Sequence, residues 1–401
     1  MTTVALPGAV TKGPVQAPLH GSPSVHLDAI RGFAAFSVLL MHWRNAFFLD
    51  YHDLPHQNAV FKLAYFISGL GHQWVIVFFV MSGYLVGGSV VRSRRQNRWS
   101  WRSYLLTRLT RLYIVLIPAL VLGGLADWAG MHLPGAQVIY SGNSGMDSLK
   151  IDVYQTLNLK VFVGNLLYMQ TEVLGVGVGH HVPTYGSNGP LWSLSNEFWC
   201  YMVFPVILIA LARFQSWRVR AGCTVLLAAW GWLVGIPYIL MCISWFMGVL
   251  LVYLPPIHIR RTSLRRLIIA AGLVLFAVGA VLEKYSENPF TVTVLGLTVV
   301  AMLWTVLHCA TGPLSAAYTW LAQRAARSSY TLYLIHMPVV VFLKTTLHLP
   351  LAAPTPRGMV IPCAVLIGTI LYAQGVYELF EKNTDRLRNW IKPYVIPSRV
   401  A

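Results

Sequence analysis

Arg31 and His42 are the residues of this sequence that most directly suggest chemistry, because both lie inside the apolar run 27–49. Eleven helical steps bring their side chains to within roughly 20° of each other, about 16 Å apart along the helix. Ionisable groups inside a membrane-spanning helix cost roughly 2.5–3.5 kcal/mol each, so they tend to face a protein interior and to mark a reaction or transport path. We therefore predict that both are catalytic, with His42 as the base that takes and returns a proton.

Each of these two residues also has a structural interpretation. A histidine in a membrane helix often forms a hydrogen bond to a neighbouring helix and does nothing else. Arg31 lies near one end of its run, where an arginine can extend to the surface. Asp28 precedes it by three residues on about the same face, so an Asp28–Arg31 pair could serve only to anchor the helix.

A carboxylate and two hydroxyls form a second polar stripe in the span 192–212. Ser193, Glu197 and Tyr201 recur at a spacing of four residues and lie directly after Trp192. Such a stripe would be costly against lipid, so it should face the interior. We predict that Glu197 is catalytic and either orients His42 or balances its charge, as a carboxylate does in triad-like sites, and that Trp192, Ser193 and Tyr201 bind substrate. The alternative is that Glu197 only bridges helices.

Three further polar side chains share one face of the span 330–349. Ser329, Tyr333 and His336 are followed by Pro338, which could kink this helix towards a cavity. We predict that the three polar residues bind substrate, although a wet helix end explains His336 equally well.

Arg108 and Arg111 lie three residues apart at the start of the span 109–130. Guanidinium groups suit phosphates, which could belong either to a soluble ligand or to anionic lipid head groups. By contrast, the run FFVMSGYLVGG indicates close helix packing through its small residues, namely Ser82, Gly83, Gly87 and Gly88.

The elements that must position these residues are membrane helices. Hydrophobic residues make up 56% of the chain, charged residues make up 11%, and the mean hydropathy is +0.60. The composition predicts an all-α polytopic membrane protein with about ten spans. We place them near 27–49, 72–92, 109–130, 192–212, 221–237, 239–254, 265–283, 291–309, 330–349 and 358–380. The fifth and sixth abut at Pro237–Tyr238, which fits either a tight hairpin or one broken helix.

The distribution of positive charge predicts the topology. If the N-terminus is cytoplasmic, 23 of the 30 lysines and arginines fall in cytoplasmic segments, so both termini should be cytoplasmic. The net charge of +17 is then a topology signal, and no nucleic-acid partner is required. We expect a disordered tail over 1–25, a membrane domain over 26–381 with a non-cytoplasmic loop at 131–191, and a basic tail over 382–401.

The sequence gives no sign of a metal site. Its five cysteines lie within or beside apolar runs and show no CxxC spacing. His180 and His181 lack a third ligand at a recognisable spacing, so we interpret them as a polar loop pair.

Five blocks of the sequence, in this order, resemble the bacterial membrane proteins of acyltransferase family 3. The blocks are HLDAIRGFAAFSVLLMHW, FFVMSGYLVG, TRLTRLYIVLIP, GPLWSLSNEFWCYMVFP and SSYTLYLIHMP, and the resemblance covers roughly residues 24–380. One departure is Val75-Ile76-Val77, where many relatives carry an acidic or polar residue before the FFV block. Some relatives also append a soluble hydrolase-like domain after the last span, where this chain has a short basic segment.

The resemblance implies an enzyme of the bacterial inner membrane. Its members transfer an acyl group, most often acetyl, from cytoplasmic acyl-CoA to a hydroxyl of a polysaccharide or another glycan. By position, His42 matches the catalytic histidine of the family, and Arg108 and Arg111 match the element that meets the acetyl-CoA donor. The alternative class is a secondary transporter or flippase of a glycan or lipid, which usually shows internal repeats that we do not find here. The sequence does not specify the acceptor or the oligomeric state.

Overall fold

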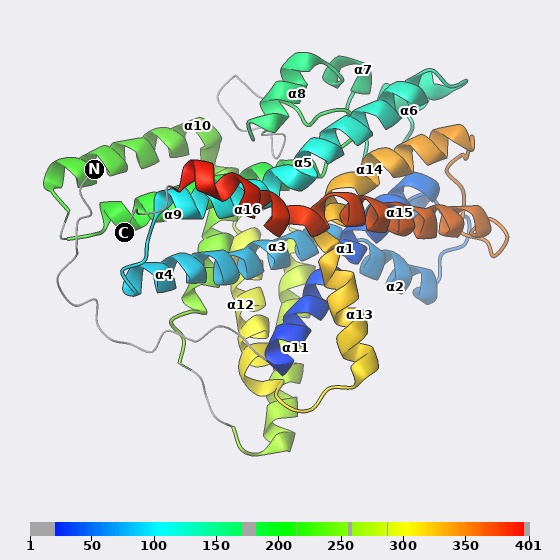
Figure 1. Ribbon diagram of the computed structural model, residues 1–401. Helices are drawn as coiled ribbons and strands as arrows, with labels where there is room; N and C mark the ends of the chain where they lie inside the picture. Colours follow the sequence, from blue (N-terminus) through cyan, green and yellow to red (C-terminus); the bar gives the residue numbers. More distant parts are fainter. Residues whose placement is uncertain (1–20, 171–181, 214, 256–258, 287, 397–401) are drawn as a thin grey trace.

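The computed structural model describes residues 21–170, 182–213, 215–255, 259–286 and 288–396, and these residues form helices and no β-strand (Figure 1). The longer helices are α1 (Ser22–Phe47), α3 (Gly71–Ser82), α5 (Trp101–Met131), α9 (Leu191–Ala210), α10 (Trp217–Leu250), α11 (Thr262–Lys284), α12 (Thr291–Cys309), α14 (Ser329–Thr346) and α15 (Val360–Leu379). The shorter ones are α2 (Ala59–Ser68), α4 (Gly88–Arg95), α6 (Ala136–Tyr140), α7 (Val153–Thr156), α8 (Leu159–Leu166), α13 (Ala316–Arg327) and α16 (Thr384–Val395). Three turns of other geometry complete the set: η1 (Tyr51–Asp53), η2 (Gly83–Gly87) and η3 (Glu381–Asn383).

The expected membrane class is confirmed. Eight described helical stretches are long and apolar enough to cross a membrane: Ser22–Phe47, Ala59–Arg95, Trp101–Met131, Leu191–Ala210, Trp217–Ile236, Thr262–Lys284, Thr291–Cys309 and Val360–Val395. The two other predicted spans coincide with the shorter apolar helix Tyr238–Leu250 and with α14, which carries the buried polar side chains of His336 and Lys344. The count of ten spans and the side of each terminus therefore stay predictions.

The fifth and sixth predicted spans form the two halves of α10, Trp217–Ile236 and Tyr238–Leu250. Gly235 produces a kink between them with φ 78° and ψ 173°, a backbone conformation that side-chain-bearing residues rarely adopt. The two spans therefore meet at this kink with no loop between them.

Besides α6, α7 and α8 in the long loop, three described helices lie outside the predicted spans. α2 follows the first span, α13 precedes α14, and α16 occupies most of the segment expected to be a basic tail. α1 also begins at Ser22, inside the segment expected to be disordered, with a proline in its first turn, where a missing N–H costs nothing. Hydropathy windows find long apolar runs and therefore miss short amphipathic helices such as these.

α1 lies at the centre of the bundle, where it packs against α3, α13 and α14, while α14 also packs against α5 and α15 (Figure 1). α9 packs against α10, and α10 packs against both α3 and η2. The approach of α10 to α3 is especially close, because a Cβ on Gly83 would lie 1.8 Å from the carbonyl oxygen of Trp245. This contact confirms close packing through Gly83.

The long loop after α5 is folded onto the bundle as α6, α7 and α8, and α7 and α8 lie along one edge of the molecule in Figure 1. Asp127 anchors the end of this loop, because its carboxylate accepts hydrogen bonds from the backbone N–H and the hydroxyl of Ser187, at 2.7 and 2.6 Å. The Asn188 side chain then donates to the carbonyl of Leu334 in α14 at 2.7 Å. These bonds fix the start of α9. His180 and His181 lie outside the described residues.

Candidate active site

A cavity of about 570 Å³ lies inside the bundle and is lined by residues of α1, α3, α5, α9, α13, α14, α15, η3 and α16. Most of the predicted site residues line it: Arg31, Arg108, Arg111, Ser193, Glu197, Tyr201, Ser329 and Tyr333. His42, His336 and Trp192 are not part of its lining. The structure thus brings together side chains from α1, α5, α9 and α14 that are far apart in the sequence.

Glu197 is held by hydroxyl groups rather than by a histidine. Its Oε1 accepts hydrogen bonds from Ser82 at 2.7 Å and from Tyr201 at 2.5 Å. Within the described part of the chain it forms no hydrogen bond to His42, so the expectation that Glu197 orients His42 is wrong. The reason is that α9 faces α3 at this level, and Ser82 of α3 occupies the position next to the carboxylate.

Ser82 is a site residue that the sequence pattern did not reveal. Besides its bond to Glu197, its hydroxyl accepts a hydrogen bond from the indole N–H of Trp245 at 3.1 Å and lies 3.1 Å from the Tyr201 hydroxyl. The neighbouring Gly83 opens the short π-helical turn η2, and such turns are frequent at functional sites. In the sequence, the small side chain of Ser82 indicated only close helix packing. Its hydroxyl group, in a helix expected to face the same interior as Glu197, was the one feature that could have indicated a role in the site.

One end of the cavity is rich in guanidinium groups. Arg31, Arg108 and Arg111 line it together with three cationic residues that the sequence analysis did not select, Arg327, Lys382 and Arg388. The acidic residues of the lining are Glu197, Glu381 and Asp385. The cations outnumber the acids, so this end favours an anionic ligand.

Two of these guanidinium groups keep an unused donor. The Nε atoms of Arg31 and Arg108 are buried and have no hydrogen-bond partner among the described residues. Arg31 also pairs with Asp28 at 3.2 Å, as the alternative interpretation allowed, and this bond uses Nη2 and leaves Nε free. A buried donor without a partner is costly, and an anionic ligand in the cavity would remove that cost.

Arg111 lies between aromatic and acidic groups. Its guanidinium carbon lies 5.8 Å from the centre of the Tyr330 ring. The Glu381 carboxylate is the charged group that interacts most strongly with it. Glu381 is buried and accepts hydrogen bonds from the backbone N–H and the hydroxyl of Thr331, at 3.2 and 2.6 Å. The sequence analysis missed Glu381 because it lies just past the last apolar span, where an acidic residue suggests only a helix end.

His42 and His336 form a pair of imidazoles between α1 and α14. Their ring centroids are 5.2 Å apart with an interplanar angle of 37°. His336 Nδ1 donates to the carbonyl of Leu332 at 3.0 Å, whereas His336 Nε2 and His42 Nδ1 are buried and without a partner. The pair therefore offers unused hydrogen-bonding nitrogens in the protein interior.

Tyr333 connects the histidine pair to the lining of the cavity through His336. Its ring lies 6.2 Å from that of His336, and its hydroxyl lies 2.6 Å from the Ser193 hydroxyl and donates to the carbonyl of Pro190 at 3.2 Å. Tyr333 and Ser193 both line the cavity. The histidines thus lie directly behind one wall of it. The remaining predicted residue, Trp192, stacks on His72 of α3.

The fold and this cavity define an integral membrane protein with a charged, partly enclosed site inside its helical bundle. A family model described as an acyltransferase domain matches residues 25–373, nearly the whole chain. The chain therefore belongs to acyltransferase family 3.

A curated relative from Haemophilus influenzae, named only as an uncharacterized protein, is 27% identical over 154 residues. The match covers 38% of this chain and 55% of the relative. No solved structure matches the chain.

Proposed function

We propose that the protein transfers an acyl group, most simply acetyl, from cytoplasmic acyl-CoA to a hydroxyl of an extracytoplasmic or lipid-linked glycan. The observation that carries the donor half of this proposal is the pair of unused guanidinium donors, on Arg31 and Arg108, in a predominantly cationic cavity. Acyl-CoA is a phosphate-bearing thioester, and guanidinium groups bind phosphates through paired hydrogen bonds.

The proposed chemistry is one exchange of bonds at the acyl carbon. His42 accepts the proton of the acceptor hydroxyl, and the hydroxyl oxygen forms a bond to the thioester carbonyl carbon. The carbon–sulfur bond then breaks, and CoA leaves as a thiol after the imidazolium returns the proton. His42 suits this role because its Nδ1 has no protein partner.

The cavity supplies the other requirements of such a reaction. Developing negative charge on the thioester oxygen needs a cationic or hydrogen-bonding group, and Arg31 and Arg111 are the cavity's candidates on α1 and α5. The apolar surroundings exclude water that would otherwise hydrolyse the donor. The acyl chain would reach His42 from the side of the cavity lined by Tyr333, whose ring lies next to His336, the partner of His42.

The experiment compares bacteria that express the wild-type protein with bacteria that express His42→Ala at matched protein levels. The O-acyl content of surface glycans is measured by mass spectrometry, and His132→Ala serves as a control because His132 is exposed at the end of α5. We expect His42→Ala to abolish O-acylation and the control to retain it. Unchanged O-acylation in the His42 variant would remove it as the base.

A second measurement tests the side from which the donor binds. Labelled acetyl-CoA is added to inverted and to right-side-out membrane vesicles, and incorporation of label into glycan is followed. We expect incorporation only in inverted vesicles, where the cytoplasmic face is exposed. Movement of a glycan or lipid across purified vesicles without acyl-CoA would instead favour a transporter or flippase.

A further inference from the structure

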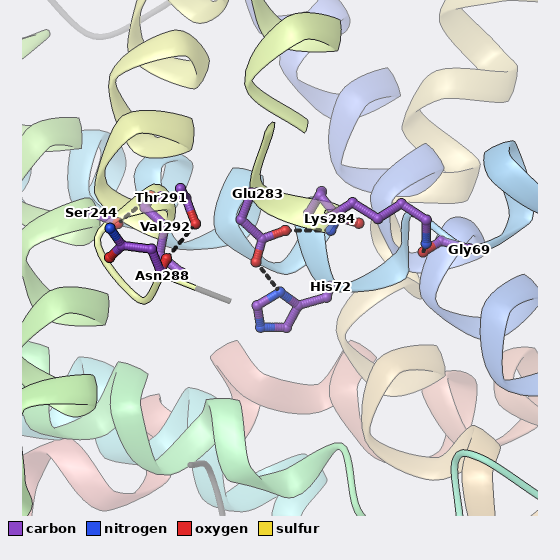
Figure 2. Close-up of polar contacts among 9 residues, drawn as sticks. Gly69, His72, Ser244, Glu283, Lys284, Asn288, Thr291 and Val292 are labelled. Atoms are coloured by element: carbon purple, nitrogen blue, oxygen red, sulfur yellow. Dashed lines mark hydrogen bonds and ion pairs between the residues drawn. The ribbon is translucent and has the colours of Figure 1, made fainter. Parts of the chain in front are cut away.

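A separate cluster of polar side chains lies where α3 begins and α11 ends (Figure 2). His72 Nδ1 donates to Glu283 Oε1 at 2.9 Å, and the Gln73 amide donates to the other oxygen of the same carboxylate. The Glu283 side chain is only 9% exposed, whereas that of His72 is 36% exposed. The carboxylate therefore fixes the imidazole, and Figure 2 shows the second ring nitrogen pointing away from Glu283.

This cluster presents two hydrogen-bond acceptors to which no described residue donates. With Nδ1 donating to Glu283, Nε2 is the ring nitrogen of His72 left for a ligand, and in the neutral tautomer it accepts a hydrogen bond. Gln73 is 4% exposed, and its Oε1 is buried without a hydrogen-bond partner. Both acceptors flank one carboxylate on adjacent residues of α3. A ligand with two neighbouring hydroxyl groups could donate to both.

An aromatic ring completes the cluster. Trp192 stacks on His72 with ring centroids 5.8 Å apart and an interplanar angle of 28°. Tryptophan combines a large apolar surface with an N–H donor, which suits a ligand that has apolar faces and polar edges. The two nearby cations are already engaged, since Lys284 donates to the carbonyl of Gly69 at 2.8 Å (Figure 2) and Arg44 donates to the carbonyl of Tyr65 at 3.2 Å. This arrangement favours a neutral polyol over an anion.

The cluster continues the cavity along α3. His72, Val75, Phe79 and Ser82 recur at three- and four-residue spacings and so share one helix face; the last three line the cavity. Ser82 is the residue that binds Glu197, near the arginine-rich end. His72 lies ten residues earlier, about 15 Å away along the helix. The cluster is therefore at the opposite end of α3 from the expected donor site.

Two series of contacts also connect the cluster to His42, the candidate base. Gly71, which precedes His72, packs against Met41, so that a Cβ there would lie 2.7 Å from the Met41 sulfur. Met41 directly precedes His42 on α1, which places His72 and His42 at about the same level of the bundle. The second series runs through α14, where His336 contacts both His42 and Tyr333. The Tyr333 hydroxyl is hydrogen-bonded to Ser193, the residue that follows Trp192.

We propose that His72, Gln73 and Trp192 bind the acceptor as a neutral polyol or pyranose ring, and that Glu283 positions His72. This inference rests on the proposed function and adds the chemical class of the acceptor and the place where it binds. An acceptor held at this point would present a further hydroxyl at the level of His42, at the opposite end of α3 from the arginine residues of the expected donor site.

Protection of His72 from chemical modification tests the proposal. The full-length protein in lipid nanodiscs is treated with diethyl pyrocarbonate, and modification of each histidine is followed by mass spectrometry. The probes are the methyl pyranosides of glucose, galactose, mannose and rhamnose, together with de-O-acylated surface polysaccharide of the expression host. We expect at least one probe to slow modification of His72 roughly threefold, as two-thirds occupancy of a site predicts, without slowing that of exposed His132.

Variants separate this site from general effects on folding. We expect Glu283→Gln and Trp192→Ala to raise roughly tenfold the probe concentration that gives half-maximal protection of His72, while Trp192→Phe raises it less. Glu378→Gln is the matched control, because that carboxylate is exposed and pairs with Lys382 at 2.7 Å. Size-exclusion profiles establish whether each variant is folded. His72→Gln replaces any variant that is not folded, and its acceptor-dependent release of CoA is then measured instead of protection.

The outcomes distinguish this inference from the proposed function. CoA release from acyl-CoA is measured on the same samples. If acyl transfer occurs but no probe protects His72, the acceptor site is overturned and the function stands. If probes protect His72 but acyl-CoA is never consumed, the polyol site stands and the acyl-transfer function fails.

Discussion

The imidazole rings of His42 and His336 lie 5.2 Å apart on two different helices, and each keeps a buried nitrogen without a hydrogen-bond partner. Such nitrogens in a protein interior are costly unless a ligand or water meets them. The two rings are not equivalent, because His336 is fixed by its bond to the carbonyl of Leu332. His42 has no such bond, so it is the ring better placed to exchange a proton.

The first prediction concerns the unequal roles of these two histidines. We expect His42→Ala to lower the rate of acceptor-dependent CoA release by about 10²–10⁴-fold, the usual contribution of a general base. His336→Phe keeps a ring against His42 and should lower the rate only about tenfold. Initial rates on the purified protein measure both effects. A greater loss from the His336 variant would reverse the assignment of the base.

The second prediction concerns Arg108, whose Nε is buried without a partner in the cavity. Arg108→Ala should raise the KM for acyl-CoA roughly tenfold, because one charge-assisted hydrogen bond to a phosphate is lost, and should change kcat less. Arg108→Lys should recover part of the loss, since lysine keeps the charge but not the planar fork. Steady-state kinetics over a range of acyl-CoA concentrations measure the difference.

Arg102 provides the control for this experiment. It belongs to the same basic segment, but its side chain is exposed and donates to the carbonyl of Val395 at 3.5 Å instead of facing the cavity. Arg102→Ala should leave the KM unchanged. An equal rise in both variants would mean that the whole segment acts through surface charge, as an anchor for anionic lipids would.

The sequence predicted well what depends on one helix. Helical periodicity alone placed Ser193, Glu197 and Tyr201 on one stripe, and the structure places all three on the same cavity with Tyr201 bonded to Glu197. Hydropathy alone indicated a polytopic helical protein. The shared stripe and the helical membrane class both depend only on segments of about twenty residues. Within such a segment, spacing and composition determine which side chains share a helix face.

Contacts between helices could not be predicted in this way. Glu197 was paired with His42 in the sequence analysis, but its partner is Ser82; His42 instead meets His336. Which faces meet depends on how closely backbones approach, and here a glycine contact between α3 and α10 determines that approach. Hydropathy contains no information on how two helices are aligned against each other. The sequence therefore indicated which helix face carries Glu197 and His42, but not which residues of other helices they contact.

The third prediction tests that glycine contact. Gly83→Ala would place a Cβ 1.8 Å from the carbonyl oxygen of Trp245, and this backbone atom cannot move without separating α3 from α10. We expect a loss of about 3 kcal/mol in stability and a lower melting temperature, together with loss of activity because Ser82 is displaced. Thermal unfolding in detergent, followed by tryptophan fluorescence, measures the change.

Gly222→Ala is the matched substitution, because nothing lies within 4 Å of the Cβ it would add. Alanine is the better helix former, so this variant should be neutral or more stable by about 0.5–1 kcal/mol. A similar melting temperature for both variants would show that α3 and α10 tolerate separation at Gly83.

The last prediction concerns Asp127, which joins the end of α5 to the segment before α9. Its two oxygens accept from the backbone N–H and the hydroxyl of Ser187. Asp127 is only 1% exposed, so Asp127→Ala would leave the Ser187 N–H buried without a partner. We expect a loss of about 3 kcal/mol and faster proteolysis between α8 and α9, since each hydrogen bond to a charged group contributes about 1.5–3 kcal/mol.

Asp127→Asn should be milder, because an amide oxygen can still accept from the backbone N–H while its NH₂ group donates to the Ser187 hydroxyl. Asp147→Ala is the control, since Asp147 forms an exposed pair with Lys150 in the same loop and such pairs contribute little. Limited proteolysis of all three variants in nanodiscs ranks them. If Asp127→Ala were as resistant as the control, the position of α9, and with it that of Glu197, would not depend on this anchor. The link between Asp127 and the active site would then have to be given up, because α9 would be held in place without it, by its packing against α10 and by the bond from Asn188 to Leu334.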